Sequence, residues 1–184
     1  MQSGSASVLR RMQRRYMPDL YRSRIETIKR LMPDAGIGAD VIVGFPGETD
    51  EEFAETVQFI ESLAMSYLHV FTYSERPDTR AALMKDQVPT KIRRERNHIL
   101  QALSTRKKRA FYESQLGRTL TAILEPNGEG YTENYVRVRI EEMRPELELV
   151  RVRLNDLQGD TIHADLLEIL AERRESMLLP ILCN

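Results

Sequence analysis

The sequence predicts an α/β protein in which part of a parallel sheet is followed by a small antiparallel β-barrel. Two near-continuous apolar runs, residues 37–45 and 67–73, are typical of strands buried on both faces, as in parallel sheets. Helical patterns lie between and after these runs, which indicates right-handed βαβ crossovers. Beyond about residue 116, apolar and polar residues alternate in short stretches separated by turn residues, as in a small barrel.

Composition narrows the class of protein. The chain has 184 residues, of which 41% are hydrophobic and 30% are charged, so it has enough apolar surface to form a core. It contains no run of about 18 apolar residues and no signal-peptide pattern, so we expect a cytoplasmic protein without a membrane partner. Its one cysteine, Cys183, excludes a disulfide framework or a cysteine-ligated metal site built from this chain alone.

Two helices are expected before the first strand. A short basic helix is predicted over residues 10–16, and a second helix ends at Pro33-Asp34-Ala35-Gly36. The residues expected to form the apolar face of the second helix recur at helical spacing and are Tyr21, Ile25, Ile28 and Met32. The strand over residues 37–45 follows, and Pro46-Gly47 ends it.

Thr49 begins the next helix. Glu52, three residues later, completes a capping-box pattern. The buried face of this helix is predicted to contain Phe53, Val57, Ile60 and Ala64. The second strand, residues 67–73, includes His69, which is expected to be a packed strand residue.

A long helix is predicted over about residues 91–115. Its apolar side is expected to contain Ile92, Ile99, Leu103 and Ala110. Two strands, with a possible strand end at Met1-Gln2, are too few for a closed barrel. Residues 1–115 are therefore expected to be a piece of a larger (β/α) domain with an unpaired sheet edge.

The second domain is expected over residues 116–170, followed by a tail over residues 171–184. Its predicted strands are residues 118–124, 135–140, 148–154 and 160–169. Asn127-Gly128 and Gln158-Gly159-Asp160 have the composition of tight turns. Four or five short strands suit an OB-like or SH3-like barrel.

Polar segments follow both strands of the first domain. Asp40 interrupts an apolar strand, so its carboxylate either hydrogen-bonds to nearby backbone or points into a site. Gly44 to Thr49 lies directly after this strand, at the end where parallel sheets bind ligands, although an ordinary turn is the alternative. Gln2 to Ser5 and Tyr73 to Pro77 are expected at the same edge, and the three segments together predict a binding site.

Basic residues gather in two blocks, residues 10–30 and 91–118, which fits a polyanionic partner or two solvated helix faces. In the strand over residues 135–140, one face is apolar. The other presents Tyr135, Arg137 and Arg139, a composition that binds RNA by stacking and phosphate contacts. The alternative is a solvated face with ion pairs.

The segments Gln2 to Ser5, Arg10 to Tyr16 and above all Asp40 to Thr49 closely resemble the radical S-adenosylmethionine (SAM) methylthiotransferases. Residues 116–170 resemble the TRAM domain, an RNA-binding β-barrel. Gly130 to Tyr135 resembles the branch that modifies N6-threonylcarbamoyladenosine at position 37 of tRNA. The branches that act on isopentenyladenosine in tRNA and on ribosomal protein S12 are the alternatives.

The resemblance implies radical SAM chemistry that adds a methylthio group to C2 of the base, with SAM and two [4Fe–4S] clusters as cofactors. The anticodon stem-loop of tRNA is the implied partner. The SAM-binding residues that it implies are Gln2, Ser3, Arg14, Asp40, Ile42, Gly44, Gly47, Glu48 and Tyr73. The RNA-binding residues that we predict are Arg118, Tyr135, Arg137, Arg139, Arg151 and Arg153.

The chain departs from the family in its cysteines. The family's C-x3-C-x2-C motif and its further N-terminal cysteines are absent. We therefore expect half of a radical SAM barrel plus a TRAM domain, with no cluster ligand or catalytic residue of its own. Such a chain would need the missing N-terminal half of the enzyme and be inactive alone. A free-standing RNA-binding module and a ligand-binding domain unrelated to SAM are the other hypotheses.

Overall fold

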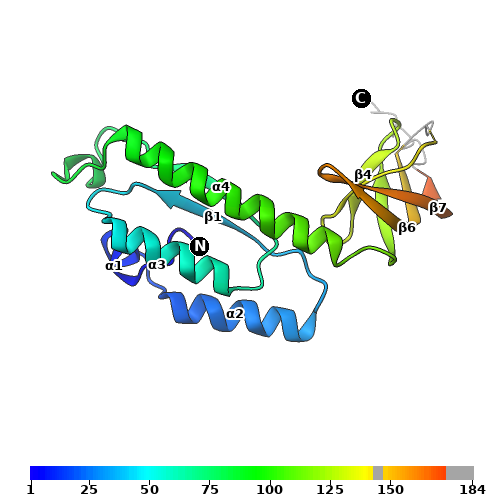
Figure 1. The fold of residues 1–184 in the computed structure, drawn as a ribbon, viewed down its shortest axis with the longest axis horizontal. Helices are drawn as coiled ribbons and strands as arrows, with labels where there is room; N and C mark the ends of the chain where they lie inside the picture. The colour runs from blue at the N-terminus through cyan, green and yellow to red at the C-terminus, as the bar shows by residue number, and fades with distance from the viewer. Residues whose placement is uncertain (143–146, 173–184) are drawn as a thin grey trace, which may run out of the picture. The chain divides into compact units, whose positions relative to one another are not determined.

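The computed structural model describes residues 1–142 and 147–172. It divides into two compact units, Met1–Phe111 and Tyr112–Asn184 (Figure 1). In the described part of the chain, no helix combines the length and the apolar character that a membrane crossing requires. Most of the predicted tail, residues 173–184, lies outside the described residues.

The first unit is built around a two-stranded parallel sheet. Its elements are α1 (Ala6–Arg11), α2 (Pro18–Leu31), β1 (Gly38–Val43), α3 (Asp50–Ser62), β2 (Tyr67–Thr72), a 3-10 turn η1 (Ala81–Leu83) and most of α4 (Thr90–Glu113). The sheet register pairs Asp40 with His69 and Ile42 with Phe71. The predicted α/β class with parallel strands is confirmed.

In the described part of the chain, helices cover one face of this sheet and leave the other open. Figure 1 shows β1 alongside α3 and α4, and the core cluster joins Val41 and Val43 to side chains of α2, α3, β2 and α4. On the other face, Asp40 and His69 are exposed. The expectations of strands buried on both faces and of a packed His69 are therefore wrong, because the described residues supply one covering layer and a two-sided strand needs two.

The N-terminal helices differ from prediction. Helix α1 ends at Arg11 rather than reaching residue 16, because Gln13 adopts a left-handed φ of 57°. Of the apolar face predicted for the second helix, Tyr21 and Ile25 reach the core cluster, whereas Ile28 and Met32 are exposed. Met32 lies just beyond the end of α2.

Helix α3 begins with the predicted capping box. Thr49 accepts a hydrogen bond from the Glu52 N–H, and the Glu52 carboxylate accepts one from the Thr49 N–H. Phe53 and Ile60 are buried as predicted, and Val57 packs against the core. Ala64 lies beyond the end of the helix and is exposed, because α3 ends at Ser62.

The predicted apolar side of α4 is confirmed only in part. Leu103 is in the core and Ile92 is partly buried, but Ile99 is half exposed and Ala110 is exposed, whereas Leu100, which was not predicted, is in the core. The helix also buries Arg93 and Arg96. Polar contacts, described below, hold these two guanidinium groups inside the unit, so the buried side of α4 includes both arginines.

The second unit is a closed barrel with the strand order β3-β4-β5-β7-β6. The strands are β3 (Thr119–Leu124), β4 (Glu129–Thr132), β5 (Arg137–Arg139), β6 (Glu148–Gln158) and β7 (Thr161–Glu172). The small barrel is confirmed, with two corrections. Strand β4 was not predicted, and the β5–β7 pair is parallel in an otherwise antiparallel barrel.

The barrel interior follows the predicted alternation. Val136, Val138 and Ile140 are buried, as are alternate residues of β3 and β6. Gly128 and Gly159 have positive φ values in the turns that the sequence marks, a conformation that glycine adopts without steric cost. The residues of the turns and the alternation of buried side chains therefore determine where the strands and turns of this unit lie.

Candidate functional site

A cavity of about 570 Å³ lies at the carboxyl ends of β1 and β2, on the uncovered face of the sheet. Five of the residues predicted to bind SAM line it together: Gln2, Arg14, Asp40, Ile42 and Tyr73. Three segments far apart in the sequence therefore converge there, as the positions of the strand ends predict.

Asp40 lies on the open face of the sheet and is exposed. Its carboxylate therefore avoids the desolvation that a strand buried on both faces would impose. The side chain lines the cavity rather than turning away from it. The arrangement leaves a negative charge available to a ligand.

The cavity offers several kinds of contact. Phe45 and Tyr73 meet edge to face with ring centroids 5.4 Å apart, and Phe71 adds a third ring to the lining. Among the described residues, the buried hydroxyl of Tyr73 has no hydrogen-bond partner. Arg14 contributes a guanidinium to the same lining. A ligand with a flat ring, a cationic centre and a carboxylate would meet a complementary group for each.

Gln2 is held in place by its neighbours. Its carbonyl oxygen accepts a hydrogen bond of 2.9 Å from the Ile42 N–H, so this segment runs beside β1. The Tyr16 hydroxyl donates to Gln2 Oε1 and accepts from the Gln2 N–H. The loop that carries Arg14 is thereby tied to the cavity.

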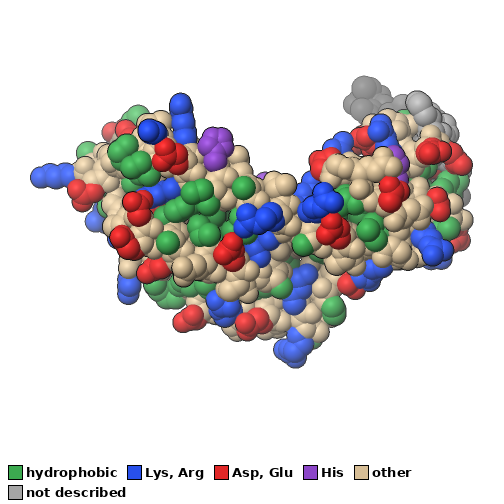
Figure 2. Space-filling model, in the orientation of Figure 1, with side chains coloured by type: hydrophobic (Ala, Val, Ile, Leu, Met, Phe, Trp, Pro, Cys, Tyr) green, Lys and Arg blue, Asp and Glu red, His purple; other side chains and the backbone are tan. Residues whose placement is uncertain are grey.

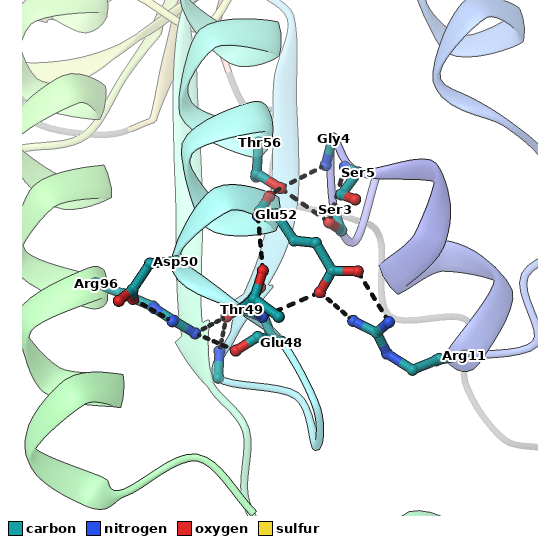
Figure 3. Close-up of polar contacts among 11 residues, drawn as sticks. Ser3, Gly4, Ser5, Arg11, Glu48, Thr49, Asp50, Glu52, Thr56 and Arg96 are labelled. Carbon is teal, nitrogen blue, oxygen red and sulfur yellow. Dashed lines mark hydrogen bonds and ion pairs between the residues drawn. The ribbon is translucent and has the colours of Figure 1, made fainter. Parts of the chain in front are cut away.

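Ser3, also predicted to bind SAM, is fully buried and does not line the cavity. Its hydroxyl shares a hydrogen bond of 3.0 Å with Thr56 and accepts one from the Ser5 N–H (Figure 3). Gly4 packs directly on α3, where a Cβ would lie 2.8 Å from Phe59 Cβ. In this structure, Ser3 and Gly4 fasten the N-terminal segment to α3.

Gly44, Gly47 and Glu48, the remaining predicted residues, lie outside this cavity. The buried Glu48 carboxylate accepts a hydrogen bond of 2.7 Å from the Gly44 N–H. It accepts another of 2.7 Å from Arg96 Nη1 (Figure 3). Burial raises the pKa of Glu48, and the Gly44 N–H and Arg96 offset part of that rise. Gly44 and Gly47 both have positive φ. These three residues shape the turn between β1 and α3.

Arg93 and Arg96 are functional candidates that the sequence analysis missed. Arg96 also pairs with Asp50 at 2.7 Å, so it holds the β1–α3 turn. Arg93 holds the connection between β2 and α4. The spacing 93, 96, 100 and 103 is the signal that would have shown them, since it continues the buried stripe of Leu100 and Leu103.

Three of the predicted RNA-binding residues are arginines that form ion pairs on two strands of the barrel. Arg137 and Arg139 on β5 both pair with Glu129, at 2.9 and 3.2 Å. Arg151 on β6 pairs with Glu168 at 3.0 Å. Strand β7 lies between β5 and β6 in the barrel, so these arginines lie on strands that are not neighbours.

The other predicted RNA-binding residues differ in exposure. Tyr135 is 68% exposed and has a φ of 65°, which is uncommon for a tyrosine. Arg153 is exposed, and Arg118 donates to the Gln115 side chain. On the face in Figure 2, basic and acidic side chains are interspersed. Two basic blocks in the sequence thus do not make a uniformly basic surface there.

Across residues 1–142 and 147–172, no three His, Cys, Asp or Glu side chains are grouped so that they could hold a metal ion. Cys183 lies outside the described residues. The side chains of the described residues therefore do not supply the ligands that an iron–sulfur cluster needs.

No family model matches the chain. It is 40% identical over 152 residues to a threonylcarbamoyladenosine tRNA methylthiotransferase of Aquifex aeolicus, covering 83% of this chain and 37% of that protein. It is 43% identical over 147 residues to the Bacillus subtilis protein of the same name, covering 75% of this chain and 33% of that protein.

A tRNA-2-methylthio-N6-dimethylallyladenosine synthase of Kineococcus radiotolerans is 40% identical over 154 residues, which are 84% of this chain and 30% of that protein. The chain thus spans about a third of the length of the curated relatives that it matches.

Proposed function

The chain belongs to the tRNA methylthiotransferase family, and from this we propose that it is the C-terminal part of an enzyme that adds a methylthio group to C2 of N6-threonylcarbamoyladenosine in tRNA. The relatives named for this nucleoside support the proposal, together with Gly130 to Tyr135. Relatives named for dimethylallyladenosine match to a similar degree, so that nucleoside is the second candidate. A tRNA substrate would make the protein cytoplasmic.

The cavity beside Asp40 is the proposed SAM site, and the convergence of Gln2, Arg14, Asp40 and Tyr73 is the observation that supports it. Asp40 would attract the cationic part of SAM, and Arg14 its carboxylate. The rings of Phe45 and Tyr73 would pack against the adenine. When bound, SAM supplies the methyl group and the precursor of the radical.

The iron–sulfur clusters of radical SAM chemistry do not fit these 184 residues, which contain one cysteine. Their ligands would have to come from another part of the enzyme. We therefore propose that residues 1–184 alone supply one side of the SAM pocket and a TRAM-type RNA-binding barrel, without methylthiotransferase activity.

A titration of residues 1–184 with SAM, followed by NMR, tests the site. We expect weak binding and a loss of about three- to tenfold in affinity in Asp40→Asn, because one charge contact near the surface is removed. Glu55→Gln, which removes an exposed charge from α3 away from the cavity, is the control and should bind like the unmodified chain. Equal affinity in all three proteins would refute the assignment of this cavity to SAM.

The RNA-binding proposal predicts that Arg137→Ala with Arg139→Ala lowers affinity for tRNA about tenfold and reduces the salt dependence of binding. The barrel should remain folded, because these partly exposed ion pairs with Glu129 contribute little stability. The charge-matched control is Arg24→Ala with Arg30→Ala, on the exposed side of α2. An equal loss in both double variants would mean that net charge, not the barrel, determines binding.

A further inference from the structure

A long connection joins β2 to α4 and forms one wall of the cavity. Between the last residue of β2 and the first of α4, its only regular structure is η1. Tyr73, Ser74, Arg76, Thr79 and Ala81 of this connection line the cavity. Connections of this length without secondary structure are uncommon in compact domains and are usually functional. The contacts that hold this connection therefore determine the shape of the cavity wall.

Arg93 makes contacts at both ends of the connection. Its side chain is 10% exposed. Nη1 donates to the Tyr73 carbonyl oxygen at 3.1 Å, and Nε donates to the Val88 carbonyl oxygen at 2.6 Å. The guanidinium carbon also lies 5.2 Å from the centroid of the Tyr73 ring. One planar group thereby holds both ends of the connection in place and orients the Tyr73 ring.

Arg93 reaches the middle of the connection through Gln87. Nη2 donates to Gln87 Oε1 at 3.2 Å and also pairs with Glu75. The Gln87 amide in turn donates to the carbonyl oxygens of Ala81 and Met84, at 3.1 and 3.0 Å. Ala81 lines the cavity, so the contacts run from α4 to the cavity wall.

Gly44 leaves space for this arrangement at the end of β1. A Cβ on Gly44 would lie 2.4 Å from Arg93 Cγ, and its φ of +73° disfavours any other residue. The stem of Arg93 thus passes over the turn of β1 while its head contacts the connection after β2. The guanidinium group has little freedom to move elsewhere.

We propose that Arg93 is a positioning residue that fixes the cavity wall of residues 73–81 and thereby the orientation of the Tyr73 ring beside the ligand. The identity of that ligand as SAM rests on the proposed function, but the fixing of the wall does not. Arg93 itself does not line the cavity, so its action on the ligand is indirect.

Limited proteolysis tests the wall. Arg80 and Lys85 are trypsin sites inside the connection. In Arg93→Gln, we expect cleavage after these two residues to accelerate about tenfold, as local opening becomes more favourable. Cleavage after Arg22 and Arg24 in α2 should not change, because the unit stays folded. Arg94→Gln is the matched control, since it removes the neighbouring exposed arginine and also one trypsin site.

A second variant keeps the test decisive if Arg93→Gln does not fold. Gln87→Leu removes the link to Ala81 and Met84 and leaves Arg93 in place, and we expect cleavage after Arg80 and Lys85 to rise about threefold. Cleavage that rises equally in the connection and in α2 would indicate general destabilisation and overturn the proposal. Cleavage equal to that of Arg94→Gln would also overturn it.

A SAM titration of the same variants separates this inference from the proposed function. Suppose that Arg93→Gln accelerates cleavage of the connection and lowers SAM affinity about tenfold at an unchanged melting temperature. The positioning role of Arg93 and the assignment of the cavity to SAM are then both supported. If cleavage accelerates but SAM affinity stays as in Arg94→Gln, the positioning role stands and the assignment of the cavity to SAM is wrong.

Discussion

Arg96→Leu is expected to lower the free energy of unfolding of the first unit by about 3–5 kcal/mol, because it leaves a buried carboxylate without its cationic partner. The side chain of Arg96 is 6% exposed and that of Glu48 is 1% exposed, so water cannot replace the lost contact. Arg96 also donates to the Glu48 carbonyl oxygen at 3.1 Å. The substitution therefore removes a charge pair and a support of the β1–α3 turn together.

Urea unfolding followed by circular dichroism measures this effect. Arg94→Leu makes the same change in side chain at an exposed position of α4, where we expect a shift within about 0.5 kcal/mol. A similar midpoint for both variants would show that the Glu48–Arg96 pair adds no net stability. The helical signal of α2, α3 and α4 reports on the first unit, because the second unit is mainly β-structure.

The loss in Arg96→Leu should also depend on pH. Burial raises the pKa of Glu48 above its ordinary value of 4.5, so the stability linked to its protonation is complete below that value and is lost as pH rises through the folded-state pKa. Arg96 is one of the groups that lower this pKa. Without Arg96, the free energy of unfolding of the variant should be closer to that of the unmodified protein near pH 4 than near pH 7. If the two free energies differ equally at both pH values, the loss does not come from a charged Glu48 that lacks its partner Arg96.

Local signals in the sequence were sufficient wherever a residue determines its own backbone. The capping box of Thr49 and Glu52 places the start of α3, and the glycines of two turns adopt the positive φ that their turn types require. Alternation placed Val136, Val138 and Ile140 inside the barrel. Strand β4 escaped prediction, because its four residues, Glu129–Thr132, include a glycine and two polar side chains.

Burial that depends on a neighbouring layer could not be predicted in this way. The apolar runs containing Ile42 and Phe71 indicate strands suited to cover on both sides, but composition does not show which layers a given set of residues provides. Asp40 illustrates the consequence, since its position in an apolar strand suggested a costly buried charge and the open face removes that cost.

The candidate site was predictable in part. Strand ends bring Gln2, Asp40 and Tyr73 to one cavity, a consequence of parallel topology. Glu48 was expected beside them, but its carboxylate turns inward to Gly44 and Arg96. Arg93 and Arg96 were overlooked, because a search for apolar residues at helical spacing passes over arginines even when their stems and head groups are buried.

Gly130→Ala is expected to abolish folding of the barrel, at a cost above about 4 kcal/mol. A Cβ at this position would lie 1.8 Å from the Ile123 carbonyl oxygen and 2.9 Å from Leu124 Cα. These atoms are backbone, so no side chain can rotate to make room. Gly130 pairs with Leu124 in the β3–β4 ladder, and the two strands would have to separate.

Gly159→Ala is the matched control, since it adds the same methyl group in the β6–β7 turn, where nothing lies within 4 Å. Its φ of +63° makes the alanine strained by roughly 1–2 kcal/mol, so the barrel should weaken but persist. Because the barrel is the proposed RNA-binding unit, Gly130→Ala should also lose affinity for tRNA, whereas Gly159→Ala should keep it. Equal unfolding midpoints for the two variants would show that β3 and β4 can part at this point without loss of the barrel, and that the close approach at Gly130 does not hold it together.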